Sequence, residues 1–381
     1  MEPRPYLIQL GDDVLADLRE RLARTRWPDE PPDAGWQYGA DLAYVRRLAA
    51  YWRRGYDWRA SEATLNAFRQ YTVPLAGIDL HFLHQPGVGP DPLPLLLSHG
   101  WPGSVWEFYK LIPLLTDPAR HGGDAADAFT VVAPSLPGYG FSFRPGQPRF
   151  GVAEIARTFA TLMTDVLGYA RFGAQGGDWG AFIAARLGAD VPQRLHGIHL
   201  NLLPIRREPD RLAGGSEEER RFAEELREWL REETGYQAIQ GTRPQTLAFG
   251  LTDSPAGLLA WLVEKFRAWS DCDGDPERAF TRDEILANAT IYWATGAIGS
   301  SFWPYYDRLH AGWPLPEGRI TVPTGYAAFP REILRPPRTV AERAFNIRHW
   351  TPMAAGGHFA ALEQPEALAG DIRAFFRPFR A

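Results

Sequence analysis

Residues Arg171 to Leu187 read RFGAQGGDWGAFIAARL, and this stretch decides the fold. Arg171 to Gln175 has the composition of a short strand, whereas the apolar side chains of Trp179 to Leu187 recur at helical spacing. Between them, Gly176-Gly177-Asp178-Trp179-Gly180 carries glycines around a central aspartate. A strand-to-helix turn this sharp admits only small neighbours and presents its central side chain at the carboxyl edge of a sheet. The motif predicts a nucleophile elbow with Asp178 at its apex, although Gly-Gly-Asp alone also fits a surface turn.

An aspartate at this apex predicts different chemistry from a serine. A carboxylate is already ionised near neutral pH, so it attacks without help from a base. It suits displacement at a saturated carbon, which produces an alkyl–enzyme ester. Water must then cleave that ester, so the site also needs a base for the second step.

The composition is that of a globular protein. Of 381 residues, 45% are hydrophobic and 23% are charged, and the formal net charge is -5. The negative charge and the lack of a basic run or zinc-type Cys/His spacing argue against nucleic-acid and metal binding. Cys272 is the only cysteine, which excludes an internal disulfide. No apolar run approaches the roughly 18 residues of a membrane span, and the N-terminus lacks a signal-peptide pattern, so we expect a cytoplasmic protein without a membrane anchor.

The first 75 residues form a segment rich in tryptophan. Helices are predicted over residues 13–24, 41–52 and 61–68, with Ser61 as the N-cap of the third. Four large aromatics are too many for a disordered tail: Trp27, Trp36, Trp52 and Trp58. We expect them to pin the segment onto the main domain; a role in shaping a ligand pocket is the alternative.

From residue 76 to 203, short apolar strands alternate with helices. A hairpin over residues 71–84 leads in; strands are expected at 93–98, 129–133, 171–175 and 195–200, and helices at 106–115, 152–167 and 179–187. This alternation predicts a mostly parallel α/β sheet.

Residues 204–312 break the alternation and read as a helical cap inserted over the carboxyl edge of the sheet. Helices are predicted at 216–234, 257–269 and 281–293, and Ser216 with Glu219 predicts a capping box. Sheet pattern resumes in residues 313–381, with strands at 320–327 and 345–350 before a closing helix at 365–376.

Two loops supply further candidates. His99-Gly100-Trp101-Pro102 follows an early strand, where the amides of Trp101 and Trp179 are expected to face the ester oxyanion. Loss of one such donor typically costs about 3 kcal/mol. His358 follows two glycines after the last strand, the position expected for the base that activates water. The alternatives are a simple turn at His99-Gly100 and a structural histidine at position 358.

The acid that orients the histidine should lie between the cap and His358, just beyond a strand. Glu332 is the best candidate, with Glu317, Glu342 and Asp307 as rivals.

Tyr236 and Tyr305 of the cap are candidates for polarising the oxygen of a strained three-membered ether. A phenol with a pKa near 10 donates a hydrogen bond to such an oxygen as its bond to carbon breaks. Buried tyrosines are usually core residues, and Tyr306, beside Tyr305, is a rival donor.

These motifs resemble the microsomal-type epoxide hydrolase family, including its soluble bacterial relatives, over nearly the whole chain. The stretches that carry the resemblance are Leu18-Arg19-Glu20-Arg21-Leu22, Thr25-Arg26-Trp27-Pro28, Tyr56-Asp57-Trp58-Arg59, His99-Gly100-Trp101-Pro102-Gly103, Gly176-Gly177-Asp178-Trp179-Gly180, Thr242-Arg243-Pro244, Asp253-Ser254-Pro255-Ala256-Gly257 and Gly356-Gly357-His358-Phe359-Ala360.

The resemblance implies an α/β-hydrolase fold with an N-terminal extension (1–75), a core in two parts (76–203 and 313–381) and a helical cap (204–312). It implies hydrolysis of an epoxide to a vicinal diol through a covalent aspartyl ester, with no cofactor and no metal. The roles it implies are nucleophile for Asp178, base for His358, acid for Glu332, and epoxide-oxygen donors for Tyr236 and Tyr305.

Rival functions remain at this point. A haloalkane or haloacid dehalogenase uses the same Asp–His displacement, and a ligand-binding module on a hydrolase fold is a further alternative. The cap tryptophans at positions 261, 269, 293 and 303 suggest a bulky or aromatic epoxide as the substrate. The sequence leaves open whether the role is xenobiotic breakdown or natural-product assembly, and whether the chain forms a homodimer.

Overall fold

One nine-stranded sheet runs through the structure, a computed structural model that describes residues 2–380. Its strands lie in the order β1-β2-β3-β5-β4-β6-β7-β8-β9. Their bounds are β1 Arg4–Pro5, β2 Gln70–Leu75, β3 Ile78–Gln85, β4 Leu93–Ser98, β5 Phe129–Pro134, β6 Phe172–Gly176, β7 Leu195–Leu200, β8 Ile320–Ala328 and β9 Phe345–Pro352. Strands β4 to β9 are mutually parallel, and β1 to β3 add an antiparallel edge. The predicted α/β-hydrolase sheet is therefore confirmed.

Strand β4 shows why its sequence is a continuous apolar run. Leu95, Leu96 and Leu97 have no exposed surface, because helices cover both faces of the sheet. Strand β4 pairs with β6 in parallel, so that Ser98 lies opposite Gly176. This register brings the loops that follow the two strands together at one edge.

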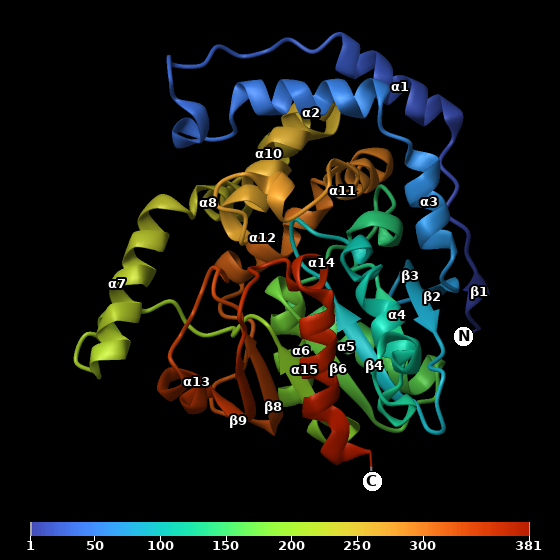
Figure 1. The fold of residues 1–381 in the computed structure, drawn as a ribbon, viewed down its shortest axis with the longest axis vertical. Helices are drawn as coiled ribbons and strands as arrows, with labels where there is room; N and C mark the ends of the chain where they lie inside the picture. The colour runs from blue at the N-terminus through green and yellow to red at the C-terminus, as the bar shows by residue number, and fades with distance from the viewer. Residues whose placement is uncertain (1, 381) are drawn as a thin grey trace.

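The covering helices form two layers. Helices α4 (Leu111–Thr116) and α15 (Pro365–Phe376) pack on one face, with α15 drawn in red in front of the sheet in Figure 1. Helices α5 (Val152–Thr161) and α6 (Asp178–Asp190) pack on the other. The single helix predicted over 106–115 is wrong: a short turn at Val105–Phe108 precedes α4, and Pro113 falls in the first turn of α4, where proline is tolerated. The helix predicted over 152–167 is α-helical as far as Thr161, and a π-helical turn, Leu162–Val166, follows it directly.

The cap lies between β7 and β8 in the chain and above the carboxyl edge of the sheet (Figure 1). Its helices are α7 Glu217–Glu232, α8 Gly235–Thr242, α9 Pro244–Asp253, α10 Pro255–Trp269, α11 Arg282–Thr295 and α12 Trp303–His310. Among residues 2–380 no single helix is long and apolar enough to cross a membrane; α9 and α10 meet the criteria only as a pair, which bends by 115°.

The capping box predicted at Ser216 is only half formed. Ser216 Oγ accepts a hydrogen bond from the Glu219 amide at 3.3 Å. The Glu219 carboxylate instead accepts from Arg343 at 2.6 Å, on helix α13 (Arg338–Ala344), because a guanidinium partner outweighs one backbone amide. The complete capping box of the cap is at the start of α11, between Thr281 and Glu284.

The first two helices of the N-terminal segment lie across the far side of the cap, and its third helix runs down beside the antiparallel edge of the sheet (Figure 1). Its helices are α1 Asp12–Ala23, α2 Leu42–Arg54 and α3 Trp58–Asn66. Trp52 is buried and donates its indole N–H to Thr290 of α11 at 2.9 Å, so this aromatic does pin the segment to the domain. The N-cap prediction is wrong: Asp57 caps α3, and Ser61 lies inside the helix, where its hydroxyl accepts from Tyr56 at 2.9 Å.

Candidate active site

Asp178 is the first residue of α6, just after β6, and has a φ of 45°, the left-handed conformation expected at a nucleophile elbow. The glycines around it are required by close contacts. A Cβ on Gly176 would lie 2.3 Å from the carbonyl carbon of Gly180, and one on Gly180 would lie 1.8 Å from the carbonyl oxygen of Ser98. The surface-turn alternative is thereby excluded.

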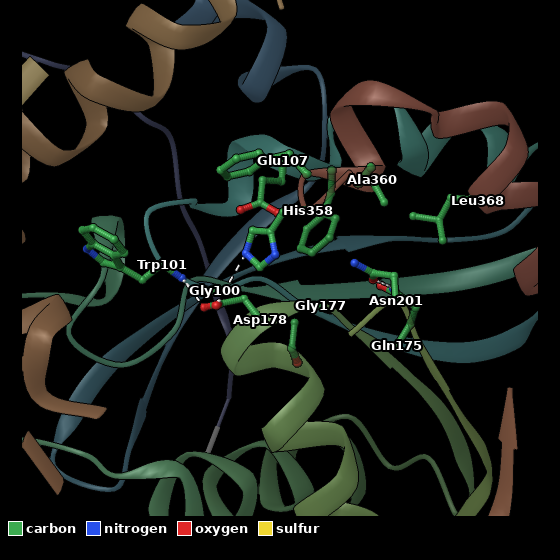
Figure 2. Close-up of a pocket in the computed structure, with 14 residues that line it drawn as sticks. Gly100, Trp101, Glu107, Gln175, Gly177, Asp178, Asn201, His358, Ala360 and Leu368 are labelled. Atoms are coloured by element: carbon green, nitrogen blue, oxygen red, sulfur yellow. Dashed lines mark hydrogen bonds and ion pairs between the residues drawn. The ribbon is translucent and has the colours of Figure 1, made fainter. Parts of the chain in front are cut away.

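The loop after β4 reaches the Asp178 carboxylate from one side. The Trp101 amide donates to Asp178 Oδ1 at 2.7 Å, as the dashed line in Figure 2 shows. Gly100 permits this approach, because a Cβ there would lie 2.2 Å from the same oxygen. The second predicted amide, that of Trp179, lies in the first turn of α6, directly after Asp178.

His358 reaches the same carboxylate from the other side. Its Nε2 lies 3.5 Å from Asp178 Oδ2, and its Nδ1 lies 2.6 Å from Glu332 Oε1. Burial alone would lower the pKa of His358, but the carboxylates of Glu332 and Asp178 raise it well above its usual value. The structure thus brings Asp178, His358 and Glu332 together in one line.

The three rival acids lie elsewhere. Glu317 is exposed on a loop, and Glu342 pairs with Arg338 at 2.7 Å on the surface. Asp307, on α12, lies beside Gly151, the N-cap of α5. Of the four candidates, Glu332 is the carboxyl that contacts His358.

Two buried tyrosines of the cap lie over Asp178 and His358. Tyr236 of α8 and Tyr305 of α12 pack together, with ring centroids 5.7 Å apart. The Tyr236 ring stacks on Trp101 at 5.3 Å, and the Tyr305 ring meets Trp179 edge-on at 4.8 Å. Both phenols therefore sit on the two residues whose amides flank Asp178.

Burial raises the pKa of both phenols above the ordinary value of 10.0, so both stay protonated and are able to donate a hydrogen bond. The Tyr305 hydroxyl is buried and has no hydrogen-bond partner among residues 2–380. Tyr306 points away from this cluster: it stacks on Trp303 at 5.0 Å and on His310 at 3.9 Å. The tyrosine adjacent to Tyr236 is thus Tyr305 and not its neighbour.

A small cavity opens beside Asp178 and His358, and Gly100 and Trp101 also line it (Figure 2). Its volume is about 20 Å³, which is room for one water molecule. Besides Asp178 and His358, polar side chains of Ser98, Glu107, Gln175 and Asn201 line it. Gln175 donates to Asn201 at 2.9 Å, and its carbonyl oxygen is buried without a partner within residues 2–380, so it is a ready acceptor for a water.

Glu107 lines the cavity above His358 in Figure 2. Burial raises the pKa of this carboxyl to about 8, with the Asp178 charge adding to the effect against the opposing charge of His358. Near neutral pH the side chain is therefore mostly a neutral acid, able both to donate and to accept a hydrogen bond.

The sequence did not single out Glu107 or Gln237. Glu107 belongs to the same segment as Trp101, and Gln237 directly follows Tyr236, so proximity to predicted residues was the available signal. Trp269 was predicted as a pocket aromatic; its ring meets His358 edge-on at 5.0 Å, and its carbonyl accepts the His358 amide at 2.8 Å. Of the other cap tryptophans, Trp293 lies under Arg21 and Trp303 on Tyr306.

Comparisons with known proteins agree with this geometry. Residues 3–108 match the family model described as epoxide hydrolase N terminus, and residues 94–244 match that of the alpha/beta hydrolase fold. A protein of Stigmatella aurantiaca provisionally named an epoxide hydrolase is 45% identical over 99% of this chain and 85% of its own length. Epoxide hydrolase 1 of Oryctolagus cuniculus is 38% identical over 98% of this chain and 88% of its own length. The crystal structure of juvenile hormone epoxide hydrolase from Bombyx mori has a TM-score of 0.89 at 32% identity, covering 100% of this chain and 95% of that one.

Proposed function

The chain belongs to the epoxide hydrolase family, and from this premise we propose how its residues convert an epoxide and water to a vicinal diol. The observation that carries the proposal is that the two carboxylate oxygens of Asp178 have different partners. Its Oδ1 is held by the Trp101 amide, while Oδ2 is free of that contact and lies 3.5 Å from His358 Nε2. One oxygen is therefore prepared to become an ester carbonyl and the other to attack.

In the first step, Asp178 Oδ2 attacks an epoxide carbon. The bond from that carbon to the ring oxygen breaks, and its electron pair goes to the oxygen. Tyr236 and Tyr305 stabilise the developing alkoxide by hydrogen bonding, since both phenols are protonated donors. The product of this step is an ester between Asp178 and one carbon of the future diol.

In the second step, water attacks the ester carbonyl carbon while His358 takes its proton. The amides of Trp101 and Trp179 hold the oxyanion, and collapse of the tetrahedral intermediate expels the diol and restores Asp178. We assign the one-water cavity beside Asp178 and His358 as the binding site of this water. Ester formation removes the Asp178 charge, so the protonated imidazole loses one of the two carboxylates that stabilise it. It then gives up its proton, which neutralises the alkoxide of the opened ring, and the neutral imidazole can take a proton from water. When the tetrahedral intermediate collapses, the second diol oxygen leaves with the remaining proton of that water.

We further propose an epoxide with an aryl or other bulky apolar substituent as the substrate. The aromatic rings of Trp101, Trp269, Tyr236 and Tyr305 crowd around the nucleophile and favour such a group. Turnover restricted to small aliphatic epoxides would contradict this part of the proposal.

A single turnover in heavy-oxygen water tests the covalent route. Enzyme in excess is mixed with styrene oxide, and the oxygen isotopes of the first diol are measured. Diol with light oxygen only is expected, because the added oxygen comes from Asp178. Heavy oxygen in the first diol would mean direct attack by water, and retention of turnover by Asp178→Ala would reject the nucleophile.

A further inference from the structure

Gln237 connects Tyr236 to two arginines. Its Nε2 donates to the Tyr236 hydroxyl oxygen at 2.7 Å. Its Oε1 accepts from Arg207 Nη1 at 2.9 Å and from Arg308 Nη2 at 2.7 Å. The two arginines come from opposite ends of the cap, one just after β7 and one on α12, and meet at a single amide oxygen.

The arginines fix which way the Gln237 amide points. A guanidinium has only donors, so the atom that faces two of them must be the carbonyl oxygen. The amide nitrogen must then face Tyr236, and the phenol oxygen can only accept from it. The hydroxyl hydrogen of Tyr236 is consequently not used in this contact.

The opposite amide orientation would have the opposite effect. A carbonyl oxygen facing Tyr236 would accept the phenol hydrogen and hold it away from any ligand. Two guanidiniums facing the amide nitrogen would meet no acceptor, which is costly for partly buried charges. The arginine pair therefore excludes the arrangement that would occupy the donor.

The same arginines place positive charge near the phenol. Arg207 lies over the Trp229 ring at 4.3 Å, and Arg308 lies over the Trp179 ring at 5.7 Å. Burial, with Arg308 nearby, lowers the pKa of Arg207 to about 10, which still leaves it charged at neutral pH. Both charges oppose the effect of burial on the pKa of Tyr236, so they favour negative charge at that hydroxyl.

We propose that Gln237, oriented by Arg207 and Arg308, is a positioning residue that keeps the Tyr236 phenol hydrogen free for the epoxide oxygen. The inference rests on the donor role of Tyr236 in the proposed function. Tyr236 and Tyr305 then both keep a hydroxyl hydrogen free for the epoxide oxygen, but for different reasons. The Tyr305 hydroxyl has no partner among residues 2–380, whereas the Tyr236 oxygen has one that can only donate to it.

Reversal of the amide polarity tests the proposal. In Gln237→Glu, one carboxylate oxygen still accepts from the arginines, and the other replaces the donor that faced Tyr236. That oxygen can only accept, so it captures the phenol hydrogen. Gln237→Leu removes the contact without capturing the hydrogen. Gln245→Glu, an exposed position on α9, is the matched control for the added charge.

The readout is a single turnover of styrene oxide that separates the rate of ester formation from the rate of ester hydrolysis. Gln237→Glu should slow ester formation by about ten- to hundredfold, the range for a lost hydrogen bond to a charged group. Ester hydrolysis should be unchanged, Gln237→Leu should be less impaired than Gln237→Glu, and Gln245→Glu should match the parent.

The same substitutions in a Tyr236→Phe background complete the experiment. If Gln237 acts through Tyr236, the change to glutamate should add almost nothing there. An equal loss in both backgrounds, or an unchanged rate in Gln237→Glu with Tyr236 present, would overturn the proposal. An undiminished rate of ester formation in Tyr236→Phe alone would instead reject the donor role itself, and with it this inference.

Discussion

Gly100 lies so close to the proposed nucleophile that a side chain there would overlap with it, and adding one carbon is a direct test of the site. A Cβ on Gly100 would lie 2.2 Å from Asp178 Oδ1, 2.4 Å from its Cβ and 2.6 Å from its Cγ. Non-bonded carbons and oxygens need more than about 3 Å, so the carboxylate or the loop must move by roughly 1 Å. Rotating the Asp178 carboxyl group alone gives no relief, because its Cβ is also too close.

Gly100→Ala should therefore lower the rate of ester formation by about a hundredfold, the usual cost of a 1 Å misplacement at a reacting centre. The overpacking should also cost about 1–3 kcal/mol of stability. Gly250→Ala is the matched control, since a Cβ at that exposed helical position meets nothing within 4 Å. Single-turnover kinetics with styrene oxide and a melting curve give the two readouts. A Gly100→Ala enzyme with unchanged ester formation and melting temperature would refute the packing of Gly100 against Asp178.

Three further substitutions test charged groups. In the unfolded chain Glu107 ionises near its ordinary pKa, whereas in the folded protein its pKa is about 8. The stability of the fold should therefore fall as the pH rises between these two values. Glu107→Gln should remove this dependence of the melting temperature on pH. Glu332→Gln should slow ester hydrolysis by about two to four orders of magnitude and leave ester formation nearly unchanged, so that intact-protein mass spectrometry detects an accumulating ester. Burial would raise the pKa of Asp371, but hydrogen bonds led by that from His199 lower it to about 2. The ionised Asp371 thus stabilises the fold above its ordinary pKa and less as pH falls toward 2, so the deficit of Asp371→Asn in urea unfolding should shrink over that range.

Much of this site follows from local sequence because its backbone requirements are local. The glycines at positions 176 and 180 are demanded by contacts within one strand–turn–helix unit and by the strand beside it. The order of nucleophile, acid and histidine along the chain likewise follows from the order of strands in a parallel sheet, since successive carboxyl ends meet at one edge. Glu332 could be preferred over its rivals for that reason, and the structure brings it to His358 at 2.6 Å.

Other features depend on contacts between distant segments. The start of α3 was misplaced because Asp57 and Ser61 are both good N-caps. The helix that Asp57 caps is held by the distant Leu10, whose amide donates to Glu62 at 2.8 Å. Tyr305 and Tyr306 are indistinguishable by residue type, and the direction of α12 relative to α8 separates them. Neither fact is encoded in a short window of sequence.

Three of the carboxyl groups near His358 show why chemistry, too, depends on the assembled fold. Asp178 has an amide donor at 2.7 Å, and Glu332 has the imidazole at 2.6 Å and the Ile333 amide at 2.7 Å. Each therefore has a partner for its negative charge. Burial acts on Glu107 without such a partner and raises its pKa to about 8. Nearly identical side chains thus become the proposed nucleophile, the proposed orienting acid and a neutral acid facing a one-water cavity, because the fold gives each of them different partners.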